Sequence, residues 1–403
     1  MTWRHTRLKH LAELPIRNGL GEAGAFDDPA WPRYVRTTDI AGPRKLRDDV
    51  FASLPPVVAS KAMLAAGDIL MTTAGATIGK STTFTEGYPA CYAGFLARFR
   101  PSEAVDGRFI AYWMQSTVYW DQINAGAVRS TIENFSASKY QNLYIAVPSL
   151  DVQRRIADFL DDQVTLLDQA IALRQQQIDL LAERLTSYKG QVVTKGLDPS
   201  VQMTDSEVPW IGIMPTSWSL LRFGYMLARA NAGEVIDKSW WGEGPETLFT
   251  CARESILSNF NTFPLEKRTT PQDILITRNA TPYVHLPQPG AIYSNVVQRV
   301  TLDPNVNREW ARYALGAASS SMHGYGVSID TLNFGMWKSL KIPVPTRSEQ
   351  DRIVEHLNQE GASVAQLLQH MTNSKSLIRE RKQSLITAVV TGGFDATTAR
   401  SVT

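Results

Sequence analysis

The segment of this chain whose residues most suggest chemistry is 74–81, which reads Ala-Gly-Ala-Thr-Ile-Gly-Lys-Ser. It matches a permissive form of the phosphate-binding loop, although the stricter form needs a glycine where Ala74 stands. A true phosphate loop runs from a strand directly into a helix whose N-terminus points at the phosphates. Residues 82–89 instead favour strand and turn, and no hydrophobic strand ending in an acidic pair follows to hold magnesium. The sequence therefore argues against nucleotide hydrolysis.

Signatures of other enzymes are also missing. The six histidines are scattered without metal-ligand spacing, and Cys91 and Cys251 form no Cys-x-x-Cys pair. Methylation of DNA bases would require a cofactor-binding glycine-rich strand–turn–helix and an Asn-Pro-Pro-aromatic motif, and neither is present in the sequence. The one Glu-x-Lys, Glu380 to Lys382, falls on an expected helix and not on the strand that a nuclease uses. We therefore expect a non-catalytic protein with no metal and no cofactor of its own.

Two polar loops carry residue types that suit DNA recognition. Each follows a short β-rich run that reads Asp-Ile-Leu-x-Thr, at 68–72 and at 273–277. Arg and Asn can read guanine and adenine edges through paired hydrogen bonds, while Thr and Lys suit phosphates. The candidate DNA-binding residues are Thr72, Thr73, Thr77, Lys80, Arg129, Thr277, Arg278, Asn279 and Tyr325. Ordinary polar loops would explain the same residues, and the Trp-Trp pair at 240–241 suits packing better than base stacking.

The two loops belong to an internal repeat that organises the whole chain. Residues 145–156 recur at 342–353, and residues 192–198 recur at 389–395 with the same offset. A constant offset means that the segment between the matched blocks has the same length in both copies. The order is therefore variable domain, shared segment, variable domain, shared segment.

Each shared segment is predicted to be a long helix. Its apolar residues alternate three and four positions apart, which is the pattern of a coiled-coil seam. A Pro-Ser or Pro-Thr pair precedes each helix, and Gly196 or Gly392 follows it. An ordinary helix buried against its own domain could show the same apolar pattern, but two helices of equal length indicate that they pair with each other. Because a whole domain lies between them in the sequence, we expect the pair to be antiparallel. The predicted seam residues are Leu167, Ile171, Ile178, Leu181, Leu185, Val364, Leu368, Met371, Ile378 and Leu385.

The predicted fold class is α+β, with an internal pseudo-twofold repeat. Two mixed α/β target-recognition domains are separated by a pair of long helices that form an antiparallel coiled coil. The predicted boundaries are 1–150 for the first domain, 151–195 for its helix, 196–347 for the second domain, 348–392 for its helix and 393–403 for a C-terminal tail.

Composition places the chain among soluble globular proteins. Its 403 residues are 43% hydrophobic, enough for two domain cores, and the net charge is only +2. A protein that binds DNA through phosphate contacts alone would be more basic, so partners would have to supply part of the electrostatic attraction to DNA. No apolar run approaches the roughly 20 residues of a membrane span, and the N-terminus lacks the apolar core of a signal peptide. We expect a cytoplasmic protein without a membrane partner.

The order of these motifs resembles the specificity subunits of type I restriction–modification systems. The Asp-Ile-Leu-x-Thr runs, the Ile-x-Val-Pro runs that lead into Gln-x-x-Ile, and Gly-Leu-Asp-Pro at 196–199 all fit that family. The segment 206–218 fits the bridge between the first helix and the second domain in that family. The resemblance extends over nearly the whole chain, and its main support is that the motifs occur twice in the same order.

The resemblance implies that each domain reads one half of a bipartite site on double-stranded DNA. It also implies two methyltransferase (modification) subunits bound around the chain, and ATP-driven restriction (translocase and endonuclease) subunits outside them. The methyl donor and ATP would bind these partners. The alternative is a structural scaffold that uses the helix pair as a spacer and does not read DNA.

Overall fold

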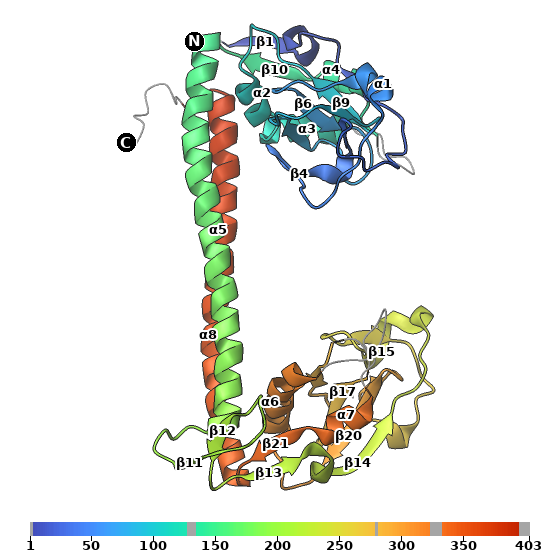
Figure 1. The fold of residues 1–403 in the computed structure, drawn as a ribbon, viewed down its shortest axis with the longest axis vertical. Coiled ribbons are helices and arrows are strands. Elements are labelled where there is room, and N and C mark those ends of the chain that lie inside the picture. The colour runs from blue at the N-terminus through green and yellow to red at the C-terminus, as the bar shows by residue number, and fades with distance from the viewer. Residues whose placement is uncertain (1–2, 127–133, 279–280, 323–332, 395–403) are drawn as a thin grey trace. The chain divides into compact units, whose positions relative to one another are not determined.

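The computed structural model describes residues 3–126, 134–278, 281–322 and 333–394. The chain divides into two compact units, one formed by 1–175 with 372–403 and the other by 176–371. Each unit holds one mixed domain together with parts of the two long helices, α5 (Leu150–Lys195) and α8 (Arg347–Val390) (Figure 1). Among the described residues, no helix combines the length and the apolar character of a membrane-spanning segment.

The first domain is built around a four-stranded antiparallel sheet with the order β2-β9-β6-β7. Its central strand β6 is buried along its whole length, as the β-rich run in the sequence suggests. The strands of this sheet are β2 (Arg17–Asn18), β9 (Leu96–Phe99), β6 (Ile69–Thr72) and β7 (Ser81–Thr83). The smaller pairs are β1 (Arg4–Arg7) with β10 (Tyr144–Val147), β3 (Arg33–Val35) in parallel with β8 (Ala90–Tyr92), and β4 (Ile40–Gly42) with β5 (Lys45–Leu46). The helices are α1 (Pro56–Ala59), α2 (Gly107–Trp113), α3 (Thr117–Gly126) and α4 (Ala137–Gln141).

The second domain repeats this plan. Its four-stranded antiparallel sheet has the order β14-β20-β17-β18, so each strand has a counterpart in the first domain at the same place in the sheet. The strands of this sheet are β14 (Leu227–Ala232), β20 (Val297–Leu302), β17 (Asp273–Thr277) and β18 (Val284–His285). The other strands are β11 (Met203–Asp205), β12 (Ile213–Pro215), β13 (Ser219–Arg222), β15 (Trp241–Phe249), β16 (Ile256–Ser258), β19 (Ile292–Tyr293) and β21 (Lys341–Val344). The helices are α6 (Arg308–Ala318) and α7 (Phe334–Ser339).

Within each unit, α5 and α8 pair in opposite directions. In the first unit, the Lys382 ammonium contacts the Asp168 carboxylate at 2.7 Å, and Lys375 donates a hydrogen bond to Gln175. In the second unit, the Tyr188 hydroxyl lies 2.6 Å from His356 Nε2. Residue numbers therefore rise along one helix as they fall along the other. All ten predicted seam residues are partly buried, as the alternating spacing requires.

Both helices end at a glycine in the left-handed region, which also confirms the sequence prediction. Gly196 and Gly392 each have a φ of +78°. That conformation strains a residue with a Cβ atom. A Cβ atom at Gly392 would also lie 3.3 Å from the Trp3 ring, and one at Gly196 would lie 3.2 Å from Trp218. Trp3 and Trp218 therefore lie against the C-terminal ends of α8 and α5.

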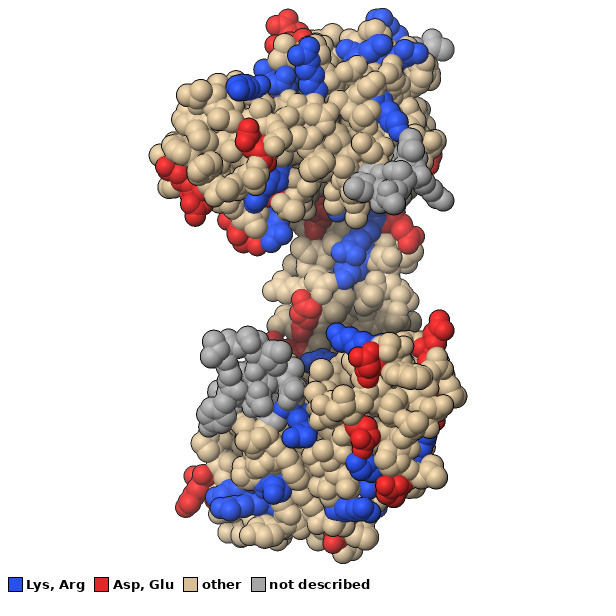
Figure 2. Space-filling view, turned by 90° about the vertical axis from the view of Figure 1, so that its right-hand side faces the viewer, with Lys and Arg blue, Asp and Glu red and all other residues tan. Residues whose placement is uncertain are grey.

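Surface charge is mixed in both units. On the face that Figure 2 shows, Lys and Arg side chains lie among Asp and Glu side chains, and no unbroken basic stripe crosses either domain. Some of the arginines are paired, as in the ion pairs of Arg100 with Asp68 and of Arg268 with Glu246, both at 2.7 Å. The arrangement agrees with the low net charge of +2.

A buried glutamine near the start of each long helix ties the domain to that helix. In the first unit, Gln153 accepts a hydrogen bond of 3.0 Å from the Asp106 amide and donates one of 2.9 Å to the Pro148 carbonyl. In the second unit, Gln350 accepts one of 2.8 Å from the Asn307 amide and donates to Pro345. The glutamine of the repeated Gln-x-x-Ile motif thus joins the N-terminus of α2 or α6 to the helix pair.

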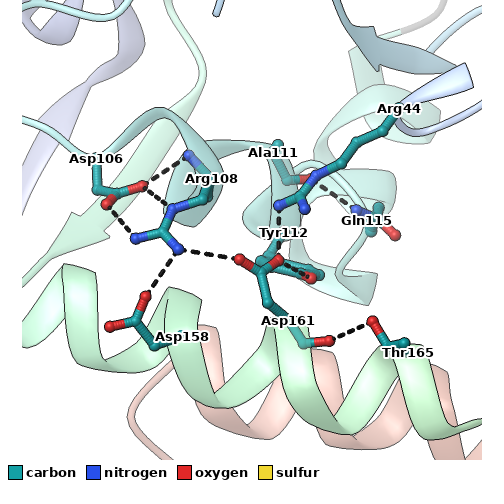
Figure 3. Close-up of polar contacts among 9 residues, drawn as sticks. All are labelled: Arg44, Asp106, Arg108, Ala111, Tyr112, Gln115, Asp158, Asp161 and Thr165. Atoms are coloured by element: carbon teal, nitrogen blue, oxygen red, sulfur yellow. Dashed lines mark hydrogen bonds and ion pairs between the residues drawn. The ribbon is translucent and has the colours of Figure 1, made fainter. Parts of the chain in front are cut away.

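In the first unit this junction also carries an ionic network (Figure 3). The carboxylate of Asp161 on α5 accepts hydrogen bonds from Tyr112 at 2.6 Å and from Arg108 at 3.0 Å, and it pairs with Arg44 at 2.8 Å. Arg108 also contacts Asp158 and Asp106. Burial, followed by the hydrogen bond to Asp161, raises the pKa of the Tyr112 phenol. The guanidinium of Arg108 has a raised pKa, chiefly because Asp106 accepts its hydrogen bonds.

The second unit makes the equivalent junction with an amide in place of Asp161. The hydroxyl of Tyr313 donates a hydrogen bond of 2.7 Å to Asn358, whose amide group donates one of 2.8 Å to Glu309. The two copies therefore share the geometry of the junction and differ in its charge.

Candidate nucleic-acid interface

The predicted DNA-contacting loop of the first domain connects β6 and β7, so residues 73–80 join two antiparallel strands. No helix follows the loop, in keeping with the rejection of a phosphate-binding loop. The hydroxyl of Tyr140 on α4 donates a hydrogen bond of 2.6 Å to the Thr72 carbonyl and accepts one of 3.2 Å from the Gly79 amide. Tyr119 donates to the Gly79 carbonyl at 2.8 Å. Two buried tyrosines thus hold both ends of the loop, and burial is the main reason that the pKa of each phenol is raised.

The four candidate residues of this loop differ in accessibility. Thr72 and Thr73 are 0% and 3% exposed, and the Thr72 hydroxyl donates to the Lys80 carbonyl at 3.1 Å. Their burial argues against direct contact with DNA and indicates that they shape the loop. Thr77 is partly exposed and Lys80 is exposed, so these two can reach a ligand.

The loop of the second domain follows β17 and has the same kind of anchor. Trp337 on α7 donates a hydrogen bond of 2.9 Å from its indole Nε1 to the Thr277 carbonyl. Thr277 is buried, and its hydroxyl bonds to the Thr281 carbonyl at 3.1 Å, so it too is a shaping residue and not a surface contact. Arg278 is partly exposed at the start of the loop, and its guanidinium lies 3.4 Å from the Asn295 carbonyl.

Three of the candidates, Arg129, Asn279 and Tyr325, lie outside the described residues. The Trp pair divides between packing and exposure. Trp241 is partly buried, whereas Trp240 is 44% exposed and meets the Phe260 ring edge to face.

A second loop accompanies the first at the same end of each sheet, and the sequence reasoning missed it. In the first domain, residues 93–95 form a turn before β9, and the Phe95 carbonyl accepts a hydrogen bond of 2.9 Å from the Thr73 amide. In the second domain, the Val296 carbonyl accepts one of 2.8 Å from the Arg278 amide. A glycine or an asparagine between two β-rich runs, at Gly94 and Asn295, was the available signal.

Next to the loop that follows β17 in the second domain, His285 on β18 is buried between aromatic rings. The ring centroids of Tyr283 and Phe249 lie 4.7 and 5.2 Å from that of His285. Burial disfavours the imidazolium and lowers the pKa of His285 to about 4. The imidazole is therefore neutral near pH 7 and acts as part of the core.

Lys80 lines a cavity where the first domain meets the helix pair of its own unit. The cavity has a volume of about 530 Å³, and Asp168, Arg379 and Lys382 of the long helices also line it. Lys382 is paired with Asp168 at 2.7 Å, so Lys80 and Arg379 give the cavity its net positive charge. The cavity is therefore suited to a phosphate group more than to a neutral ligand.

Comparison with known proteins agrees with this arrangement. Residues 53–182 match the family described as the type I restriction modification DNA specificity domain. The specificity subunit of the type I restriction enzyme StySPI from Salmonella potsdam is 23% identical over 133 residues. That match covers 33% of this chain and 29% of the relative, so the aligned region spans less than a third of the relative's length.

Two solved structures share the fold. A chain from a structure that addresses complex assembly and conformational transition of the type I restriction–modification system has a TM-score of 0.71 at 16% identity, over 96% of this chain and 97% of that one. The HsdS subunit from Thermoanaerobacter tengcongensis has a TM-score of 0.50 at 16% identity, over 98% of this chain and 97% of that one. The comparisons confirm the resemblance to type I specificity subunits, and with it the fold of two mixed domains and two long helices.

Proposed function

We propose that this chain is the DNA-recognising specificity subunit of a type I restriction–modification complex, and that each domain reads one half of a bipartite site. The observation that carries the proposal is that both domains present a loop at the same end of the same sheet. Both domains use the same sheet and fix the carbonyl of Thr72 or Thr277 in the same way, yet the loops that follow differ in sequence. A repeated frame with unlike loops suits two readers of two unlike half-sites.

In this proposal the helix pair sets the spacing between the half-sites and binds the methyltransferase subunits. Three leucines of the helices in the first unit, Leu166, Leu173 and Leu377, are 56%, 60% and 64% exposed. Exposed leucines on helices that already have a buried seam are suited to further helix packing. A Leu173→Glu and Leu377→Glu double variant is expected to lose co-purification with the methyltransferase subunits. A Gln169→Glu and Ala172→Glu double variant, at exposed positions of α5, adds the same charge and is the control.

The chain itself is proposed to be non-catalytic. The methyl donor and ATP would be bound by the methyltransferase and restriction partners, and the complex would act in the cytoplasm. Partners that surround the DNA would also compensate for the mixed surface charge of this chain.

The test is co-expression with the methyltransferase subunits of a type I system from the same host, followed by methylation-aware sequencing of the host DNA. The expected result is one modified motif with two specified halves and an unspecified spacer. A purified complex that binds DNA without sequence preference at a stated salt concentration would instead indicate a spacer scaffold. Methyl transfer by the purified chain without partners would contradict the non-catalytic role.

A further inference from the structure

We propose that Phe95 is a specificity-determining residue of the first domain, and that its ring contacts the methyl group of a thymine in the half-site which this domain reads. The inference rests on the proposed function and adds a base type to it. It begins from the exposure of the side chain, since Phe95 is 65% exposed. Leaving such a ring in water is unfavourable, and an apolar contact in a complex would remove that cost.

The turn that carries Phe95 is held rigidly by its neighbours. The Gly94 amide donates a hydrogen bond of 2.6 Å to the Leu20 carbonyl, and the Asn18 side chain donates one of 2.6 Å to the Gly94 carbonyl. The Phe95 carbonyl accepts from Thr73 at the start of the predicted DNA-contacting loop. A ring on a fixed turn can contact a ligand with little loss of conformational entropy.

The ring also has free space beside it. Phe95 lines a cavity of about 530 Å³ together with Leu20, Tyr34, Arg36 and Thr37. A base edge could therefore approach the ring without displacing other side chains. Thymine is the base that presents a methyl group in the major groove, and phenylalanine is among the side chains that contact it.

Comparison of the two copies favours DNA over a protein partner. Two identical methyltransferase subunits would be expected to contact similar residues in both domains. The corresponding turn of the second domain carries Asn295 and Val296, which share neither the size nor the aromatic character of Phe95. A residue that differs between the copies while its backbone bond is retained suits the reading of different half-sites.

The experiment crosses a change in the protein with a change in the DNA. The complex with its methyltransferase subunits is titrated with duplexes of its mapped site, in which each thymine in turn is replaced by uracil, which lacks the methyl group. For the unmodified chain, one position in the first half-site is expected to weaken binding about fourfold, the effect of one buried methyl group. Phe95→Ala is expected to abolish that difference and to leave the thymine and uracil preferences of the second half-site unchanged.

Two further variants complete the test. Phe95→Leu keeps an apolar contact, so it should retain part of the thymine preference, and it also serves if Phe95→Ala folds poorly. Phe51→Ala removes another exposed phenylalanine of the same domain that does not line the cavity, and it should bind as the unmodified chain does.

Three outcomes would overturn the inference while the proposed function stands: a first half-site without thymine, an unchanged thymine-to-uracil ratio in Phe95→Ala, or loss of methyltransferase binding with DNA preference intact. Failure of the unmodified complex to prefer any sequence would overturn the proposed function itself, and this inference with it.

Discussion

The hydroxyl of Tyr140 lies 2.6 Å from the Thr72 carbonyl oxygen, and the same place in the second domain is taken by the indole of Trp337, 2.9 Å from the Thr277 carbonyl oxygen. Both side chains are completely buried. A phenol and an indole thus perform one task, which is to satisfy the last carbonyl of the strand before each loop. An unsatisfied buried carbonyl would cost about 1–3 kcal/mol, so the bond helps to fix where each loop begins.

Removing either bond is expected to impair one half-site only. Tyr140→Phe keeps the ring but loses the hydroxyl, and it should lower the free energy of unfolding by about 1–3 kcal/mol. Methylation-aware sequencing should show relaxed specificity in the half-site of the first domain. Trp337→Phe should do the same in the second domain. Relaxation of both half-sites by either variant would count against independent domains.

Arg278 is expected to contribute to recognition by the second domain. Arg278→Ala should weaken binding of one half-site by about 1–3 kcal/mol if the guanidinium contacts a base edge. The half-site read by the first domain should be unaffected, and Lys80→Ala provides the reciprocal variant. Binding titrations with duplexes altered in one half-site at a time would measure both effects. Equal loss at the two half-sites would indicate a general phosphate contact.

The repeat and the helices could be predicted from the sequence because they depend on local pattern. The seam from Leu167 to Leu185 follows from three–four spacing, and the end of the helix follows from Gly196, whose φ is +78°. Both are properties of a single segment, so they can be deduced without knowing the tertiary structure.

The accessibility of the loop residues could not be predicted in the same way. Thr72 and Thr277 have suitable side chains for DNA, but Tyr140 and Trp337 lie about 60 residues or more further along the chain and cover those positions only after folding. Phe95 was missed for the opposite reason. A phenylalanine between two β-rich runs reads as core, and only the turn at Gly94 places its ring at the surface.

The ionic junction of the first unit makes its stability dependent on Asp161. Asp161→Ala removes the shared partner of Arg44, Arg108 and Tyr112, and it should lower the free energy of unfolding by about 1–3 kcal/mol. Asp161→Asn, which copies Asn358 of the second unit, should retain the bond to Tyr112. Its deficit should shrink as salt is added, because the lost contacts are partly exposed ion pairs. Urea unfolding at low and high salt would measure this.

The reciprocal variant Asn358→Asp places a carboxylate beside Glu309, and like charges at that distance repel. It should destabilise the second unit. A gain in stability from Asn358→Asp, or a loss of stability in Asp161→Asn that does not depend on salt, would contradict the conclusion that the first junction is ionic and the second is not.

Burial of His285 predicts that the second unit loses stability in mild acid. Its pKa is about 4 in the folded protein, against 6.5 for the ordinary side chain. Between these values the unfolded chain binds the additional proton, so stability is fully present near pH 7 and decreases as the pH falls from about 6.5 towards 4. The loss is on the order of 2–3 kcal/mol. His285→Phe should remove this dependence in thermal unfolding measured from pH 7 to 4.5, whereas His5→Gln, at an exposed position, should retain it.

The helix pair provides the last prediction, which concerns the spacer between half-sites. Seven residues are inserted into each helix at positions that face each other, next to Gln175 and Lys375, which are hydrogen-bonded across the pair. A heptad keeps the seam in register and lengthens each helix by about 10 Å, which corresponds to roughly three base pairs of DNA. Because three base pairs also rotate the DNA by about 100°, the preferred spacer is expected to lengthen by one to three pairs, with some loss of activity. A library with randomised spacer length, selected by binding or methylation, would reveal the change while both half-sites stay the same. A heptad added to α5 alone should break the seam and reduce binding at every spacer length. An active double insertion with unchanged spacing would show that the helix pair does not set the distance.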